Sequence, residues 1–154
     1  MEHIIILGRG GAGKSTFARR LGSVTGLPVI ELDEWFWQPG NTEPSHHRWV
    51  ELQRKLITPD RWIIEGDLGP HDALEPRLCV ADTVIVLDFS LLPCAWRSIR
   101  RSRERWDYWR WLFGYRRRSL PAIMAMVASH APRAHVCQLG NRREANALLA
   151  AVSS

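Results

Sequence analysis

The sequence predicts an α/β fold, with a five-stranded parallel sheet and helices on both faces, in one domain spanning residues 1–154. Short apolar runs alternate with helical segments along the chain. These runs lack strict alternation of apolar and polar residues, which is typical of strands buried on both faces. The chain has 154 residues, 45% of them hydrophobic, enough for one core but not for two.

The beginning of the chain predicts a strand, a loop and a helix. Residues 3–7 (HIIIL) are apolar, residues 8–15 (GRGGAGKS) are rich in glycine, and residues 15–26 have helical composition. The loop satisfies G-x-x-x-x-G-K-[ST], the P-loop pattern, in the strand-to-helix context that this pattern requires. The sequence therefore predicts a P-loop nucleotide-binding fold.

The chemistry of phosphate binding explains this spacing. Glycines let backbone N–H groups curl around a phosphate, and the following helix adds its positive N-terminal end. We expect Lys14 to reach the β and γ phosphates of ATP, and the Ser15 hydroxyl to ligate Mg²⁺. The predicted ATP-binding residues are Gly8, Gly10, Gly11, Ala12, Gly13, Lys14, Ser15 and Thr16.

Four further strands are predicted downstream. The second follows Pro28 and ends at Asp33, the third ends at Glu65, the fourth ends at Asp88, and the fifth covers residues 134–139. Helices are expected over residues 45–58, 120–130 and 141–152, and in the Arg- and Trp-rich segment after Asp88. In the first of these, Trp49, Leu52 and Leu56 form an apolar stripe, which is typical of an amphipathic helix. Asn141 and Glu144 have the spacing of a capping box.

Carboxylates end three of the predicted strands, at the edge where parallel sheets bind ligands. Glu65 and Asp88 compete for the Mg²⁺ side of the site, and the local pattern does not separate them; Glu65 is the preferred candidate. Asp33 precedes Trp35, Phe36 and Trp37. A carboxylate beside an aromatic wall suits orientation or deprotonation of an acceptor hydroxyl, the alternative being a helix cap beside ordinary core aromatics.

Positive charge is concentrated in residues 97–119. This segment holds nine of the nineteen arginines and a formal charge of +7, whereas the rest of the chain carries −2. A protein that grips a DNA duplex usually spreads its basic residues over a broad face, so the local excess favours a lid over small-molecule phosphates. A solvated face is the alternative for the triple arginine, residues 116–118.

With the P-loop, the stretches LDEWFWQPG, RWIIEGD, ADTVIVLDFS and RRRSLP resemble the adenylate kinase-like P-loop kinases. More closely they resemble the DNA topology modulation protein family, small P-loop proteins related to adenylate kinases, over about residues 1–150. The resemblance implies a short helical lid at about residues 97–120. It also places Glu65 at the position where adenylate kinases carry an Asp, and Arg142 near the base. Of the lid arginines, it places Arg97 near the adenine or the phosphates and Arg101 on the phosphates, with one or more of Arg116, Arg117 and Arg118 reaching in from the far side of the lid.

The acceptor side departs from the adenylate kinase pattern. Adenylate kinases hold the AMP phosphate with arginines after the second and third strands, and EWFWQPG and GDLGPHD contain none. We therefore expect an acceptor other than AMP, with Arg48 or Arg54 as contacts for any phosphate it carries.

The predicted function is an ATP- and Mg²⁺-dependent phosphotransferase acting on a small-molecule acceptor such as a nucleoside or nucleotide. Its predicted catalytic residues are Lys14, Asp33, Arg97, Arg101 and Arg117, with Ser15 and Glu65 as the metal site. The alternatives are a nucleic-acid-binding ATPase affecting DNA topology and a nucleotide-binding regulator with little turnover. No run approaches the ~20 apolar residues of a membrane span, so we expect a cytoplasmic protein.

Overall fold

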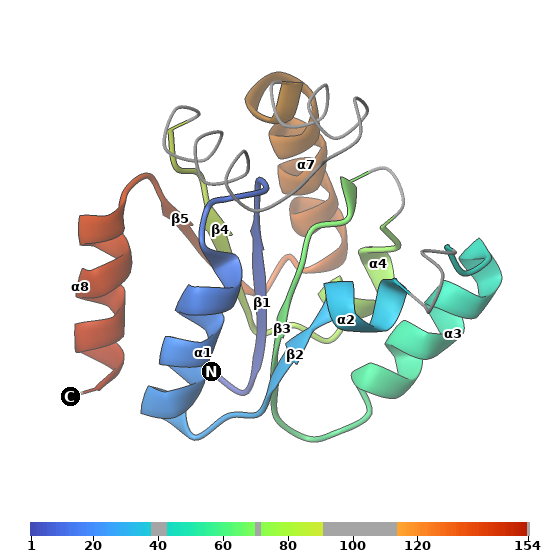
Figure 1. The fold of residues 1–154 in the computed structure, drawn as a ribbon, viewed down its shortest axis with the longest axis horizontal. Helices are drawn as coiled ribbons and strands as arrows, with labels where there is room; N and C mark the ends of the chain where they lie inside the picture. Colours follow the sequence, from blue (N-terminus) through green and yellow to red (C-terminus); the bar gives the residue numbers. More distant parts are fainter. Residues whose placement is uncertain (38–42, 70–71, 91–113, 154) are drawn as a thin grey trace.

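A computed structural model of the protein describes residues 1–37, 43–69, 72–90 and 114–153. Five strands form one parallel sheet in the order β2-β3-β1-β4-β5, which confirms the predicted sheet (Figure 1). The strands are β1 (His3–Gly8), β2 (Val29–Glu31), β3 (Trp62–Glu65), β4 (Thr83–Leu87) and β5 (His135–Leu139). The first strand therefore lies in the middle, with the ends of β3 and β4 on either side of the loop that follows it.

Helices cover both faces of the sheet, as predicted (Figure 1). One face carries α1 (Lys14–Thr25) and α8 (Arg142–Val152), and the other carries α3 (His46–Leu56), α4 (Glu75–Leu78) and α7 (Leu120–His130). Ile4 and Ile6 of β1 belong to the core under α1, whereas Ile5 and Leu7 belong to the opposite core. Burial on both faces explains why the strands read as continuous apolar runs.

The second strand is shorter than predicted, and the expectation that it ends at Asp33 is wrong. It ends at Glu31, and a short helix, α2 (Leu32–Phe36), follows at once. Leu32 and Phe36 face the core at 2% exposure or less, whereas Glu34 between them is exposed. In an extended strand all three side chains would share one face, whereas in a helix residues four apart share a face and the residue two positions on points elsewhere. Asp33 therefore lies in the first turn of a helix, where a negative charge is favoured.

Two further elements are α4, which has no counterpart in the prediction, and the π-helical turn η2 (Tyr115–Ser119), which leads into α7 and falls at the end of the helical lid predicted at about residues 97–120. The earlier part of that lid, including Arg97 and Arg101, lies outside the described residues. The capping box is confirmed in a modified form. The Asn141 side chain accepts a hydrogen bond from the Glu144 backbone N–H at 3.0 Å, and the Glu144 carboxylate accepts one from Gly140 N–H at 2.7 Å.

Across the part of the chain that the structure describes, no helix has both the length and the apolar character needed to cross a membrane.

Two tryptophans give a matched test of the core. Trp49 is 1% exposed and packs edge-on against Phe36, with ring centroids 4.9 Å apart, whereas Trp35 is 47% exposed. We expect Trp49→Ala to lower the free energy of unfolding by about 3–5 kcal/mol, since it leaves a large cavity. Trp35→Ala should lower it by less than about 1 kcal/mol. Urea unfolding measures both, and equal losses would contradict this description of the core.

Candidate functional site

The glycine-rich loop leaves β1 through a conformation that requires glycine. Gly8 has φ +147°, and a Cβ atom there would lie 2.6 Å from the carbonyl oxygen of Leu87 in β4. Gly11 and Gly13 also have positive φ, and α1 begins directly after Gly13. The loop therefore ends at the N-terminus of α1, where the P-loop pattern predicts a phosphate.

Lys14 and Ser15 are both held at this loop. The Lys14 ammonium donates to the carbonyl oxygens of Gly8 at 2.9 Å and of Arg9 at 3.3 Å. The Ser15 hydroxyl donates to Oε1 of Glu65 at 2.7 Å, which joins the start of α1 to the end of β3. The structure thus brings together Lys14, Ser15 and Glu65, the three residues predicted to contact the phosphates and the metal.

Glu65 lies in a setting that favours a cation. Its side chain is 3% exposed, and burial raises the pKa of this carboxyl, with the Lys14 ammonium and the Ser15 hydroxyl opposing the rise. The nearby carboxylates of Asp33 and Glu31 raise the pKa further. A divalent ion beside Glu65 would relieve the cost of this buried negative charge.

Asp88, the competing carboxylate, is occupied differently. It is 8% exposed, and its Oδ1 accepts a hydrogen bond from Nε of Arg116 at 2.8 Å. Nη2 of Arg116 donates to the Asp88 carbonyl oxygen at 3.1 Å, and the Gln138 amide donates to Oδ2 at 3.3 Å. The two carboxylates that the local sequence pattern did not separate therefore have different partners: Glu65 bonds the loop hydroxyl, and Asp88 bonds an arginine of η2.

Asp33 lies close enough to Glu65 to raise its pKa, and α2 presents aromatic side chains beside it. Trp35 and Trp37 are 47% and 45% exposed, whereas Phe36 belongs to the core. The sequence left two alternatives for these rings, an aromatic wall for an acceptor or ordinary core packing. Phe36 is an ordinary core residue, whereas Trp35 is not.

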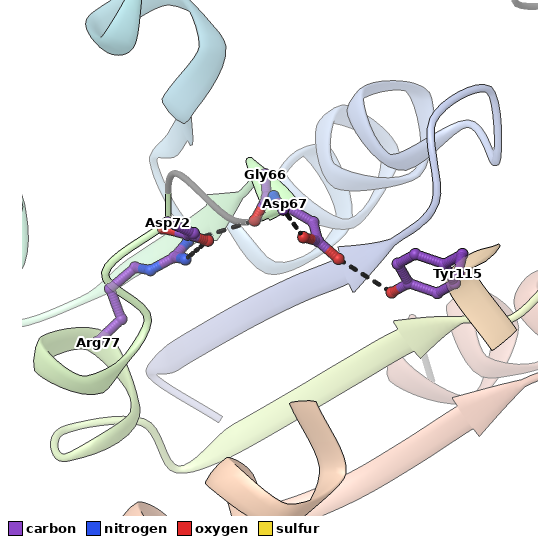
Figure 2. Close-up of polar contacts among 6 residues, drawn as sticks. Gly66, Asp67, Asp72, Arg77 and Tyr115 are labelled. Atoms are coloured by element: carbon purple, nitrogen blue, oxygen red, sulfur yellow. Dashed lines mark hydrogen bonds and ion pairs between the residues drawn. The ribbon is translucent and has the colours of Figure 1, made fainter. Parts of the chain in front are cut away.

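The loop after β3 is fixed by residues that the sequence did not single out (Figure 2). Arg77 of α4 is fully buried; it donates to the carbonyl oxygen of Gly66 at 3.3 Å and forms an ion pair with Asp72. A Cβ atom on Gly66, whose φ is +143°, would lie 2.8 Å from Cβ of Leu32. The backbone between Glu65 and Asp67 is therefore tightly determined.

These contacts could not be predicted from the sequence. Arg77 lies in the short stretch EPRL, which matches none of the motifs found in the sequence, and its partners are 5 and 11 residues away. Arg9 reads as a variable position of the P-loop, yet its side chain is 2% exposed and stacks on Tyr115. Buried charged residues of this kind become visible only when the fold brings their partners together.

The other predicted polar side chains that the structure describes are exposed on the surface. Thr16 is exposed in the first turn of α1, Arg117 is exposed in η2, and Arg142 is the exposed first residue of α8. Arg48 and Arg54 are exposed on α3.

No protein-family model matches this chain, and neither does any curated protein. Among solved structures, it resembles shikimate kinase from Acinetobacter baumannii in complex with shikimate, with a TM-score of 0.69, 17% identity, and coverage of 99% of this chain and 90% of that one. It also resembles a sugar kinase from Janibacter sp. HTCC2649 (TM-score 0.60, 18% identity, coverage 100% and 99%). A third similar structure is deoxyadenosine kinase from M. mycoides with bound dATP (TM-score 0.61, 14% identity, coverage 98% and 99%). At these identities the likeness shows the fold: this chain has the P-loop kinase fold.

Burial of the Glu65 charge predicts a pH-dependent stability difference. Because the folded-state pKa lies above the ordinary value of 4.5, the wild-type protein loses stability as the pH rises from 4.5 through the folded-state pKa. Glu65→Gln keeps an acceptor for Ser15 and removes the charge. We expect its Tm at pH 7 to exceed that of wild type by about 3 °C or more, with the gap closing toward pH 4.

Thermal unfolding at several pH values measures this gap, with Glu51→Gln, an exposed carboxylate on α3, as the control. A lower Tm for Glu65→Gln than for wild type at pH 7 would show that the charge stabilises the fold.

Proposed function

We propose that the protein is an ATP- and Mg²⁺-dependent phosphotransferase that acts on a hydroxyl group of a small-molecule acceptor. The observation that carries this proposal is the hydrogen bond from the Ser15 hydroxyl to Glu65, directly beside Lys14 in a glycine-rich loop. A fold with this loop needs a cation site next to the phosphates, and these side chains supply the oxygen atoms that Mg²⁺ prefers.

The residues of the glycine-rich loop, together with Glu65, fit ATP and Mg²⁺. Gly11 and Gly13 have positive φ directly before α1, a conformation in which backbone N–H groups can face a phosphate. Lys14 donates to the carbonyl oxygens of Gly8 and Arg9, which holds its ammonium at the loop where the β and γ phosphates of ATP would lie. Ser15 and Glu65 would hold Mg²⁺, which supplies charge neutralisation on the phosphate oxygens. Arg97, Arg101 and Arg117 remain predicted phosphate contacts, and Arg142 a predicted base contact.

On the acceptor side, Asp33 is the proposed base. It would take the proton of the acceptor hydroxyl while the acceptor oxygen bonds to the γ-phosphorus and the bond to the leaving ADP breaks. The exposed rings of Trp35 and Trp37 in the same segment suit an acceptor with a flat or sugar-like face. The DNA topology modulation resemblance and the cytoplasmic location remain predictions.

The test is ADP release from Mg·ATP in three samples: with pooled nucleosides, nucleotides and sugars, with DNA, and with neither. Lys14→Ala serves as the blank, because it removes the loop cation while sparing the core. We expect the small-molecule pool to raise the rate in wild type alone, after which the pool can be divided to identify the acceptor. A rise with DNA only would replace the kinase by the nucleic-acid-dependent ATPase, and tight ATP binding without ADP release would favour the regulator.

Asp33→Asn should lower kcat by about 10²–10⁴-fold with little change in the KM for ATP, since a general base is lost and the phosphate loop is untouched. Glu34→Gln, an exposed carboxylate in the same turn, is the matched control and should keep wild-type rates. Equal rates for Asp33→Asn and wild type would remove Asp33 from the chemistry.

A further inference from the structure

Tyr115, the first residue of η2, contacts two separate parts of the candidate site. Its side chain is fully buried, and its hydroxyl donates to Oδ2 of Asp67 at 3.0 Å (Figure 2). Its ring lies beneath the guanidinium of Arg9, 5.5 Å from the ring centroid. One side chain from the start of η2 thus contacts both the phosphate loop and the loop after β3. π-helical turns such as η2 are rare and occur often at functional sites.

Arg9 depends on this ring. Its side chain is 2% exposed, and within the described residues its Nε has no hydrogen-bond partner. The backbone of the same residue is part of the phosphate loop: its carbonyl oxygen accepts hydrogen bonds from Lys14 Nζ at 3.3 Å and from Ala12 N–H at 3.2 Å. A buried guanidinium without hydrogen bonds at Nε gains from an aromatic face, so the ring helps to fix the loop at Arg9.

Asp67 is fixed from the other side. Its Oδ1 accepts a hydrogen bond from Gly69 N–H at 3.1 Å, and the preceding Gly66 carbonyl is held by Arg77. The Tyr115 hydroxyl completes this arrangement. Burial and the neighbouring Asp67 carboxylate raise the pKa of Tyr115, so the hydroxyl stays protonated and donates.

We propose that Tyr115 is a positioning residue of the phosphotransfer site, which holds Asp67 and Arg9 in the single arrangement that the phosphate loop needs. It acts through these two residues and touches neither nucleotide nor acceptor. Catalysis of phosphoryl transfer consists largely of positioning, so loss of this support should slow the reaction more than it weakens the fold. The inference rests on the proposed function.

The experiment is a double-mutant cycle with Tyr115→Phe, Asp67→Asn and the double variant. Tyr115→Phe removes the hydroxyl and keeps the ring over which Arg9 stacks. We expect kcat to fall by about 10- to 100-fold in each single variant. In the Asp67→Asn background, Tyr115→Phe should add less than about a twofold loss, because the two groups act as one unit. Ser153→Ala, which removes one hydroxyl hydrogen bond at the end of α8, is the control and should change nothing.

The affinity for a non-hydrolysable ATP analogue, measured by calorimetry, is the second readout. Tyr115→Leu, which also removes the ring, should weaken this affinity more than Tyr115→Phe does, because Arg9 loses its aromatic partner. If wild type binds the analogue but phosphorylates no acceptor, the proposed function fails, and the cycle is evaluated on affinity instead. Wild-type kcat and affinity in Tyr115→Phe, or losses that add fully with those of Asp67→Asn, would overturn the inference.

Discussion

The hydrogen bond from the Ser15 hydroxyl to the Glu65 carboxylate joins the phosphate loop to the end of β3, and the other site residues are arranged around it. It depends on the parallel register of the sheet, which pairs Glu65 with Ile6, two residues before Gly8. The register places the carboxylate level with the end of β1, and the loop then returns to it through Ser15. A fold with β3 beside β1 can bring these groups together although they lie 50 residues apart.

The site concentrates charged groups that a stable core would avoid. Burial raises the pKa of both Glu65 and Asp67, while the fully buried Arg77 and the nearly buried Arg9 carry positive charge into the same edge of the sheet. Buried charges cost stability unless they are paired, and perturbed pKa values of this kind gather at functional sites. The Lys14 ammonium opposes the rise in pKa of both carboxyls, and the Mg²⁺ of the proposed function would add further positive charge at this edge.

Most of the fold could be predicted from local pattern, because apolar runs and a glycine-rich loop act over a few residues. The five strands, their parallel arrangement and the helix that begins at Lys14 follow from such patterns. The end of β2 at Glu31 could not be predicted from local pattern, since burial of Leu32 and Phe36 in the core decides it. The choice between Glu65 and Asp88 also depends on distant partners, Ser15 and Arg116, as does the contact of Tyr115 with Asp67 across 48 residues.

The affinity of the protein for Mn²⁺, a paramagnetic substitute for Mg²⁺, tests whether Ser15 and Glu65 form the metal side of the site; it is measured by electron paramagnetic resonance in the presence of a non-hydrolysable ATP analogue. We expect Glu65→Gln to weaken Mn²⁺ binding by about 10- to 100-fold, since groups that orient a ligand contribute on this scale. Asp88→Asn, at the end of β4, should leave it near the wild-type value. The reverse ranking, with Asp88→Asn the damaging change, would contradict the assignment of the metal side to Ser15 and Glu65.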